Sequence, residues 1–158
     1  MLSVKLIGAL FIGISGVIMS ISYRRFQLRK LETVDGFISL LFYIKGQIDC
    51  FSRPRGEILA SLPFEVFCAC NCPSGAETLE ELVERSRIYL DEETLRLLNS
   101  FSSEFGSTFK DEQLRRCDYY ISALSEERKR VYATVSARSR AGGALWIFAC
   151  LGLLILLW

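Results

Sequence analysis

The 158-residue chain contains no histidine. Histidine is the most common general base and the most common neutral metal ligand, so its absence excludes Ser-His-Asp and Cys-His catalytic sites within this chain. The sequence also lacks a glycine-rich phosphate loop and a nucleophile elbow. We therefore predict no catalytic residue, no cofactor site and no enzymatic function.

The chain has no large excess of either charge and no pattern of a β-protein. Its 19 lysines and arginines nearly balance 18 acidic residues, which gives a net charge of +1. That balance gives no reason to expect a nucleic-acid partner, and no motif indicates a small-molecule substrate. No segment alternates apolar and polar residues over several positions, and no hairpin turn pair occurs. These absences favour an all-α fold.

Six cysteines are present, but their spacing matches no disulfide framework of a secreted protein. Cys68, Cys70 and Cys72 are close enough in sequence to supply three thiolates to zinc. Tetrahedral zinc sites usually pair two-residue knuckles, and the sequence offers no evident fourth ligand. We favour the alternative, in which these cysteines are reduced, small apolar residues on a helix, and we predict no metal site.

Apolar residues concentrate at the two ends of the chain. Leu6–Tyr23 and Ala141–Trp158 contain no aspartate, glutamate, lysine or arginine. An α-helix of this length spans about 27 Å, close to the thickness of the hydrocarbon core of a bilayer. We predict transmembrane helices within residues 1–23 and 141–158, with a domain at residues 24–140 between them.

Each apolar run has an alternative interpretation. The first could be a cleaved signal peptide, with Lys5 at its positive end and Ser20 and Ser22 as small residues near a cleavage site. Arg24 and Arg25 follow at once, and such charges are typical of the cytoplasmic flank of a retained anchor. The second run could be a core helix, but it has no polar face, and a domain of this size offers little space to bury it.

The charges beside the two runs predict the orientation in the membrane. Positively charged residues accumulate on the cytoplasmic side of membrane helices. Arg24 and Arg25 follow the first run, and Arg138 and Arg140 precede the second. The outer sides hold only Lys5 and the two termini. We therefore expect residues 24–140 in the cytoplasm.

The central domain has helical periodicity throughout. Apolar residues recur every three or four positions between residues 24 and 50, at Leu28, Leu31, Val34, Ile38, Leu41, Phe42 and Ile48. A near-heptad stripe marks the last helix, at Leu114, Cys117, Ile121, Leu124, Arg128, Val131 and Val135. Both helices could continue into the terminal runs, where Gly142-Gly143 could kink the second. With both membrane ends on one side, these helices should lie antiparallel and pack along the two stripes.

Shorter helices are expected between the two long ones. Pro63 separates a helix at about 55–62 from another at 64–72. Ser74 and Glu77 have the spacing of a capping box at the start of the next helix. With one further helix before the last, the prediction is an antiparallel bundle of about six helices.

Two polar surfaces are candidates for contact with a protein partner. The first is acidic and consists of Glu77, Glu80, Glu81 and Glu84. The second lies on the last helix and includes Gln113 and Arg116. Both also have a simpler interpretation. Acidic residues favour helix N-termini, and charges three or four positions apart compensate one another on solvent-exposed faces.

Two blocks of sequence carry a resemblance to a known family. The first is YRRFQLRKLETVDGFISLLFYIKGQIDCFSRPRGEILASL, in which a membrane segment is followed by Arg24-Arg25 and a long helix. The second is LRLLNSFSSEFGSTFKDEQLRRCDYYISALSEERKR, in which Phe105-Gly106 ends one helix and Gln113 opens the last. Together with the apolar C-terminal tail, these blocks resemble stage III sporulation protein AB of endospore-forming bacteria over nearly the whole chain.

The chain departs from that family's pattern at three places. The usual Glu-Ile-x-Tyr after the first long helix reads Gln47-Ile-Asp-Cys50, and the usual Pro-Leu reads Pro54-Arg55. The middle block with its three close cysteines has no clear counterpart. These departures affect the packing expected there and any interface in that block.

The resemblance implies a specific role. The family is similar in fold to the cytoplasmic helical domains of F-type platform proteins in type II secretion and type IV pilus machines. It belongs to a secretion-like channel complex between mother cell and forespore, which late forespore gene expression requires. The implied partners are other stage III sporulation membrane proteins and a cytoplasmic secretion-type ATPase. The implied location is the outer forespore membrane. The bundle then lies in the mother-cell cytoplasm, where it docks the ATPase.

The sequence and the resemblance together predict a non-enzymatic membrane platform. An alternative of a different class is a membrane-anchored metal or redox sensor that uses Cys68, Cys70 and Cys72.

Overall fold

The computed structural model describes the backbone of residues 2–51 and 55–157, and the solvent exposure of Gly8 and of residues 14–51 and 56–136 with their side chains. Every regular element in these ranges is a helix, which confirms the predicted all-α class. The chain divides into two compact units. We call residues 29–131 the bundle unit, and residues 1–28 together with 132–158 the terminal unit.

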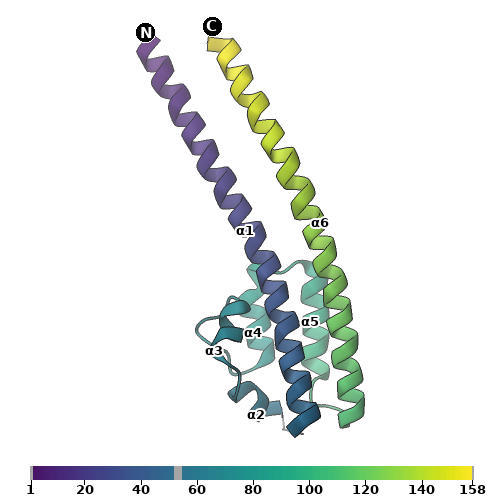
Figure 1. Cartoon of the computed structure of the whole chain (residues 1–158). Coiled ribbons are helices and arrows are strands. Elements are labelled where there is room, and N and C mark those ends of the chain that lie inside the picture. The colour runs from purple at the N-terminus through teal and green to yellow at the C-terminus, as the bar shows by residue number, and fades with distance from the viewer. Residues whose placement is uncertain (1, 52–54, 158) are drawn as a thin grey trace. The chain divides into compact units, whose positions relative to one another are not determined.

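The helices follow one another along the chain as Figure 1 shows: α1 (Leu2–Phe51), α2 (Arg55–Ala60), α3 (Phe64–Ala69), α4 (Leu79–Ser86), the 3-10 helix η1 (Arg87–Tyr89), α5 (Glu92–Glu104) and α6 (Lys110–Leu157). Helix α1 has 50 residues and α6 has 48, so each continues from the bundle unit into the terminal unit. Helix α6 passes through Gly142-Gly143 as helix.

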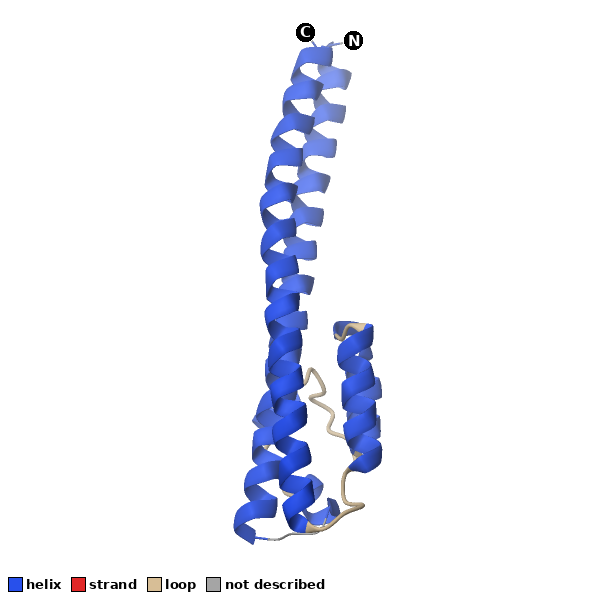
Figure 2. Ribbon diagram, turned by 90° about the vertical axis from the view of Figure 1, so that its right-hand side faces the viewer, coloured by secondary structure: helices blue, strands red, loops and turns tan. Residues whose placement is uncertain are grey.

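Within the bundle unit, α1 and α6 lie side by side and antiparallel (Figures 1 and 2). Arg128 of α6 forms an ion pair with Asp35 of α1. Further along α1 and nearer the start of α6, Lys45 Nζ lies 2.6 Å from Asp118 Oδ1. The residue number rises on α1 as it falls on α6, so the two helices run in opposite directions, as predicted.

The core of the bundle unit draws on five of its helices. The largest fully buried side chains are Phe37, Leu40, Leu41 and Ile44 of α1, Ile58 of α2, Leu79 and Leu82 of α4, Leu98 of α5 and Leu124 of α6. Burying a leucine, isoleucine or phenylalanine stabilises a fold by about 1.5–3 kcal/mol per side chain. The stripe predicted on the last helix is confirmed at Cys117, Ile121, Leu124 and Val131, which are buried, but not at Arg128, which is almost half-exposed.

The stripe predicted on α1 is partly wrong. Phe42 is 56% exposed and Leu28 is 45% exposed, although both were expected in the seam. The buried face is centred on Phe37, Leu41 and Ile44, and Phe42 lies about 100° around the helix from Leu41. Apolar character alone does not distinguish these two neighbours, because each lies three or four residues from other apolar positions.

The capping box predicted for α4 is also wrong in position. The N-cap is Thr78, whose Oγ1 accepts a hydrogen bond from the Glu81 N–H at 3.1 Å. Thr78 and Glu81 have the same three-residue spacing as Ser74 and Glu77, so the sequence offered two candidates. Ser74 instead accepts a hydrogen bond from Arg85 at 2.8 Å.

Candidate functional site

The acidic surface at α4 is partly compensated by arginines three or four residues further along the chain. Glu81 Oε1 lies 2.6 Å from Arg85 Nη2, and Glu84 Oε1 lies 3.1 Å from Arg87 Nη1. Glu77 and Glu80 are exposed. This local pairing reduces the net negative field that α4 presents to a basic partner.

Glu81 has a local structural role as well. Its Oε2 accepts a hydrogen bond from the Glu77 N–H at 2.8 Å, which satisfies a backbone donor just before the helix. That backbone hydrogen bond is the main cause that lowers the pKa of the Glu81 carboxyl, and Arg85 lowers it further. The carboxylate therefore stabilises the start of α4.

Gln113 and Arg116 lie at the junction of α5 with α6. Gln113 Nε2 donates to the Thr108 carbonyl at 2.8 Å, just before α6 begins. Arg116 donates to Glu104 of α5 at 3.0 Å and to Glu112 at 3.2 Å. Both side chains are half-buried and hold the junction together. No hydrogen bond or ion pair among the described residues joins them to the acidic surface of α4, so the two candidate surfaces are separate.

Aromatic packing reinforces this junction. The ring of Phe101 lies 5.5 Å from that of Phe105 and 5.3 Å from that of Tyr120. Tyr120 also donates to Glu104 at 3.2 Å, and burial with the nearby Glu104 raises the pKa of its hydroxyl. The combination suits a rigid joint between helices better than an open docking surface.

The predicted topology charges lie on the long helices. Arg24 and Arg25 are exposed on α1. Arg138 and Arg140 belong to α6, but their side chains fall outside the described part of the chain. Their role in fixing orientation therefore stays a prediction.

The described stretch of α1 in the terminal unit exposes nearly all its large apolar side chains. The exposed residues are Ile14, Val17, Ile18, Met19, Ile21, Tyr23, Phe26 and Leu28. Met19 is 75% exposed and Ile18 is 59% exposed. At about 100° per residue these positions are distributed around the whole helix, and a soluble monomer rarely exposes a contiguous apolar surface of this kind.

Among the residues whose side chains are described, no helix contains a stretch long and apolar enough to cross a bilayer. The predicted anchors at residues 1–23 and 141–158 fall largely outside those residues, since the side chains of 1–7, 9–13 and 137–158 are not described.

Cys68, Cys70 and Cys72 surround the end of α3 and differ in their exposure. Cys68 is exposed, whereas Cys70 and Cys72 are buried. Helix α3 ends in a Schellman motif, in which the Cys72 N–H donates to the Phe67 carbonyl at 2.9 Å and Asn71 adopts a φ of 56°. Cys70 is the C-cap, and Cys72 is the buried residue that commonly completes this motif.

The chemistry of the buried thiols follows from that packing. Burial raises the pKa of the Cys70 thiol to about 12 and that of the Cys117 thiol to about 11. A thiol with a raised pKa is a poor nucleophile and a poor metal ligand at neutral pH. No group of three or more cysteine, aspartate or glutamate side chains in the described part of the chain could hold a metal ion.

Helix α3 approaches α1 very closely at Gly36. A Cβ placed on Gly36 would lie 2.4 Å from the carbonyl carbon and oxygen of Ala69, which is closer than atoms can approach. The Asn71 side chain then fastens the end of α3 to α1, because its Nδ2 donates to Thr33 Oγ1 at 2.6 Å. Thr33 is completely buried. The junction is therefore fixed by backbone packing and by a buried hydrogen bond.

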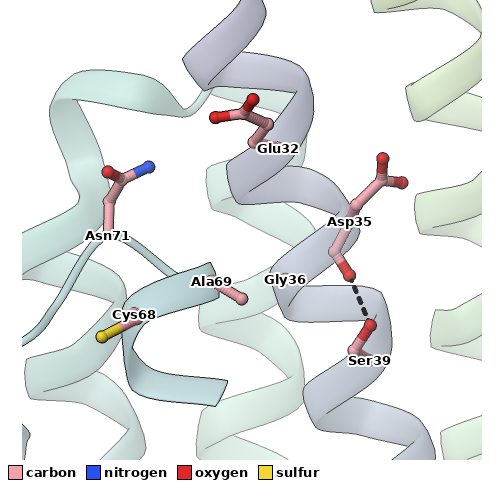
Figure 3. A pocket seen from close by; sticks show the side chains of 7 residues that line it. All are labelled: Glu32, Asp35, Gly36, Ser39, Cys68, Ala69 and Asn71. Atoms are coloured by element: carbon pink, nitrogen blue, oxygen red, sulfur yellow. Dashed lines mark hydrogen bonds between the residues drawn. The ribbon is translucent and has the colours of Figure 1, made fainter. Parts of the chain in front are cut away.

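A pocket of about 390 Å³ opens beside this junction (Figure 3). It is lined by Glu32, Asp35, Gly36, Ser39, Cys68, Ala69 and Asn71. Glu32 points from α1 to the side on which Asn71 lies, and Asp35 points the other way (Figure 3). Asp35 is ion-paired with Arg128. No hydrogen bond or ion pair joins the Glu32 carboxylate to another described residue.

This pocket was not predicted from the sequence, although one signal was available. A glycine in a helix interior is less favourable than alanine by about 1 kcal/mol and usually has a packing reason. Gly36 lies in the middle of an apolar helical stripe, so its presence indicates a close approach of another backbone. Which segment approaches, and which side chains then line the space, depends on the tertiary fold.

Comparison of the sequence with models of known families, with characterised proteins and with solved structures finds no match.

Proposed function

We propose that the chain is a membrane-anchored helical scaffold whose bundle unit docks a cytoplasmic protein. The observation that carries this proposal is the all-round apolar exposure of α1 between Ile14 and Leu28. Lipid is the environment in which such a surface is stable, because it removes the apolar side chains from water. The uncharged C-terminal run supports a second anchor.

The flanking charges support a cytoplasmic bundle unit. Arg24 and Arg25 follow the N-terminal apolar run, and Arg138 and Arg140 precede the C-terminal run. Positively charged residues accumulate on the cytoplasmic side of membrane helices. Both runs carry these charges on the side that leads to the bundle unit.

A dock is the role that suits the bundle unit. Its core is built from closely packed helices, and ion pairs such as Lys45–Asp118 and Arg116–Glu104 hold those helices together. The resemblance to stage III sporulation protein AB extends the proposal. On that basis the scaffold belongs to the secretion-like complex between mother cell and forespore. It binds a secretion-type ATPase and neighbouring stage III membrane proteins from the outer forespore membrane.

Genetic complementation tests this function. In an endospore-forming bacterium that lacks its own stage III AB protein, the full chain should restore late forespore gene expression. A chain carrying Ile14→Arg and Ile18→Arg should fail to do so, because two charges in the apolar segment oppose insertion. If the full chain reaches the membrane in normal amounts and restores nothing, the sporulation role is wrong.

A further inference from the structure

We infer that the pocket between α1 and the end of α3 receives the charged head of an arginine side chain from a protein partner. The inference rests on the proposed function, since it assigns the docking role of the bundle unit to a specific place. The pocket is open to solvent on one side, and its volume of about 390 Å³ leaves room for the head of a charged side chain.

The charge of the lining favours a cation. The lining contains two carboxylates, on Glu32 and Asp35, and no lysine or arginine. Arg128 compensates the Asp35 carboxylate from the α6 side. Glu32 has no hydrogen bond or ion pair with another described residue, so its charge is available to a ligand. A guanidinium matches a carboxylate with two parallel hydrogen bonds, which an ammonium group does not provide.

The uncharged lining suits the rest of an arginine side chain. Gly36 and Ala69 present little more than backbone and a methyl group, and an aliphatic stem can lie along such a surface. The Asn71 amide uses its Nδ2 to donate to Thr33, which leaves its oxygen as an acceptor. The Ser39 hydroxyl donates to the Asp35 carbonyl at 2.9 Å, as the dashed line in Figure 3 marks.

The site is held in place before a ligand arrives. Gly36 contacts the backbone of Ala69 and Cys70, so α3 cannot approach α1 more closely. The left-handed backbone of Asn71 and its hydrogen bond to Thr33 fix the other side of the pocket. A rigid site loses little conformational entropy on binding, which favours recognition of a single charged side chain.

Two natural cysteines provide a test. Cys68 lines the pocket and is exposed, and Cys50 is exposed at the end of α1, outside the pocket lining. The purified full chain in lipid nanodiscs is alkylated with iodoacetamide, with increasing concentrations of the peptide acetyl-Ala-Arg-Ala-amide. Mass spectrometry follows both thiols. The peptide should slow alkylation of Cys68 in a saturable way and leave Cys50 unaffected. The same peptide with neutral citrulline should protect neither thiol.

Variants separate a charge-specific site from general electrostatics. Glu32→Gln should weaken protection of Cys68 by about three- to ten-fold, the effect expected from a partly exposed ion pair. Glu57→Gln removes the same charge from an exposed position on α2 and should change nothing. The inference is overturned if the arginine peptide protects both cysteines equally or neither, or if Glu32→Gln behaves like the parent chain. That outcome is independent of complementation, which tests the proposed function.

Discussion

Residues 14–28 and residues 29–51 belong to one helix, α1, but they place their apolar side chains in different surroundings. In the first stretch Ile18 and Met19 are exposed, whereas in the second Phe37 and Leu41 are completely buried. Both stretches are apolar enough for a core. The difference teaches that apolar sequence alone does not decide burial: the second stretch has its partners within the bundle unit, while the first leaves its apolar side chains exposed in the described part of the chain.

The largest expected effect comes from placing charges in the exposed apolar stretch. Ile14→Arg together with Ile18→Arg should release the N-terminal anchor, because an arginine at the centre of a membrane helix costs about 2.5–3.5 kcal/mol on insertion scales. The measurement uses a chain that lacks residues 141–158, so that the C-terminal run cannot retain it, and compares the fraction that stays in the membrane pellet after an alkaline wash. Ser100→Arg with Ser122→Arg, at exposed positions of the bundle unit, is the matched control and should leave that fraction unchanged. Equal fractions for both pairs would contradict the comparison.

Neighbouring residues in the second stretch test its core. Leu41→Ala should lower the free energy of unfolding by about 2–5 kcal/mol, because a completely buried leucine leaves a cavity. Phe42→Ala, next to it and 56% exposed, should lower it by less than about 1 kcal/mol. Urea unfolding can be followed through alkylation of buried Cys117, with Cys50, Cys68 and Cys150 replaced by serine. Similar losses for the two variants would mean that the buried face of α1 is assigned wrongly.

Replacing either of two glycines of α1 by alanine should change the free energy of unfolding, in opposite directions for the two positions. Gly36→Ala should destabilise the bundle unit by about 1–3 kcal/mol, because its Cβ would collide with the Ala69 backbone. Gly46→Ala meets nothing within 4 Å and should stabilise by up to about 1 kcal/mol, the helix propensity of alanine over glycine. The same unfolding measurement applies. A stable Gly36→Ala variant would show that α3 does not pack against α1 at this point.

The smallest expected effect is that of the ion pair between α1 and α6. Asp35 and Arg128 are each almost half-exposed, so their interaction should contribute at most about 1 kcal/mol. A double-mutant cycle with Asp35→Asn and Arg128→Gln measures this coupling directly. A coupling of several kcal/mol would mean that the pair, rather than apolar packing, sets the register of the two helices.

Helix type and direction could be predicted from the sequence because they depend on local signals. Spacing of apolar residues located both long helices, and the placement of charge predicted that they are antiparallel. Finer assignments failed where two residues fitted the same pattern. The N-cap of α4 is Thr78 and not Ser74, and the core contains Leu41 and not its neighbour Phe42. Only tertiary packing separates such alternatives.

The candidate surfaces were harder to predict because charge in sequence does not reveal pairing. Glu81 and Arg116 looked like surface charges and instead stabilise a helix start and a helix junction. Glu32 lines the pocket because α3 ends beside it, which no pattern in the sequence around Glu32 predicts. A site formed by two segments that lie far apart in the sequence, residues 32–39 and 68–71, depends on the chain between them that brings them together.

The exposed thiol of Cys68 tests the central claim most directly, since it reports which side of a membrane holds the bundle unit. Intact cells expressing a Cys50→Ser, Cys150→Ser chain are treated with a membrane-impermeant maleimide, and the chain is recovered from alkali-washed membranes. The account predicts that the chain is in those membranes, that Cys68 is unlabelled in intact cells, and that it is labelled after permeabilisation. Labelling of Cys68 in intact cells, or a chain absent from the washed membranes, would contradict a membrane-anchored scaffold with a cytoplasmic bundle.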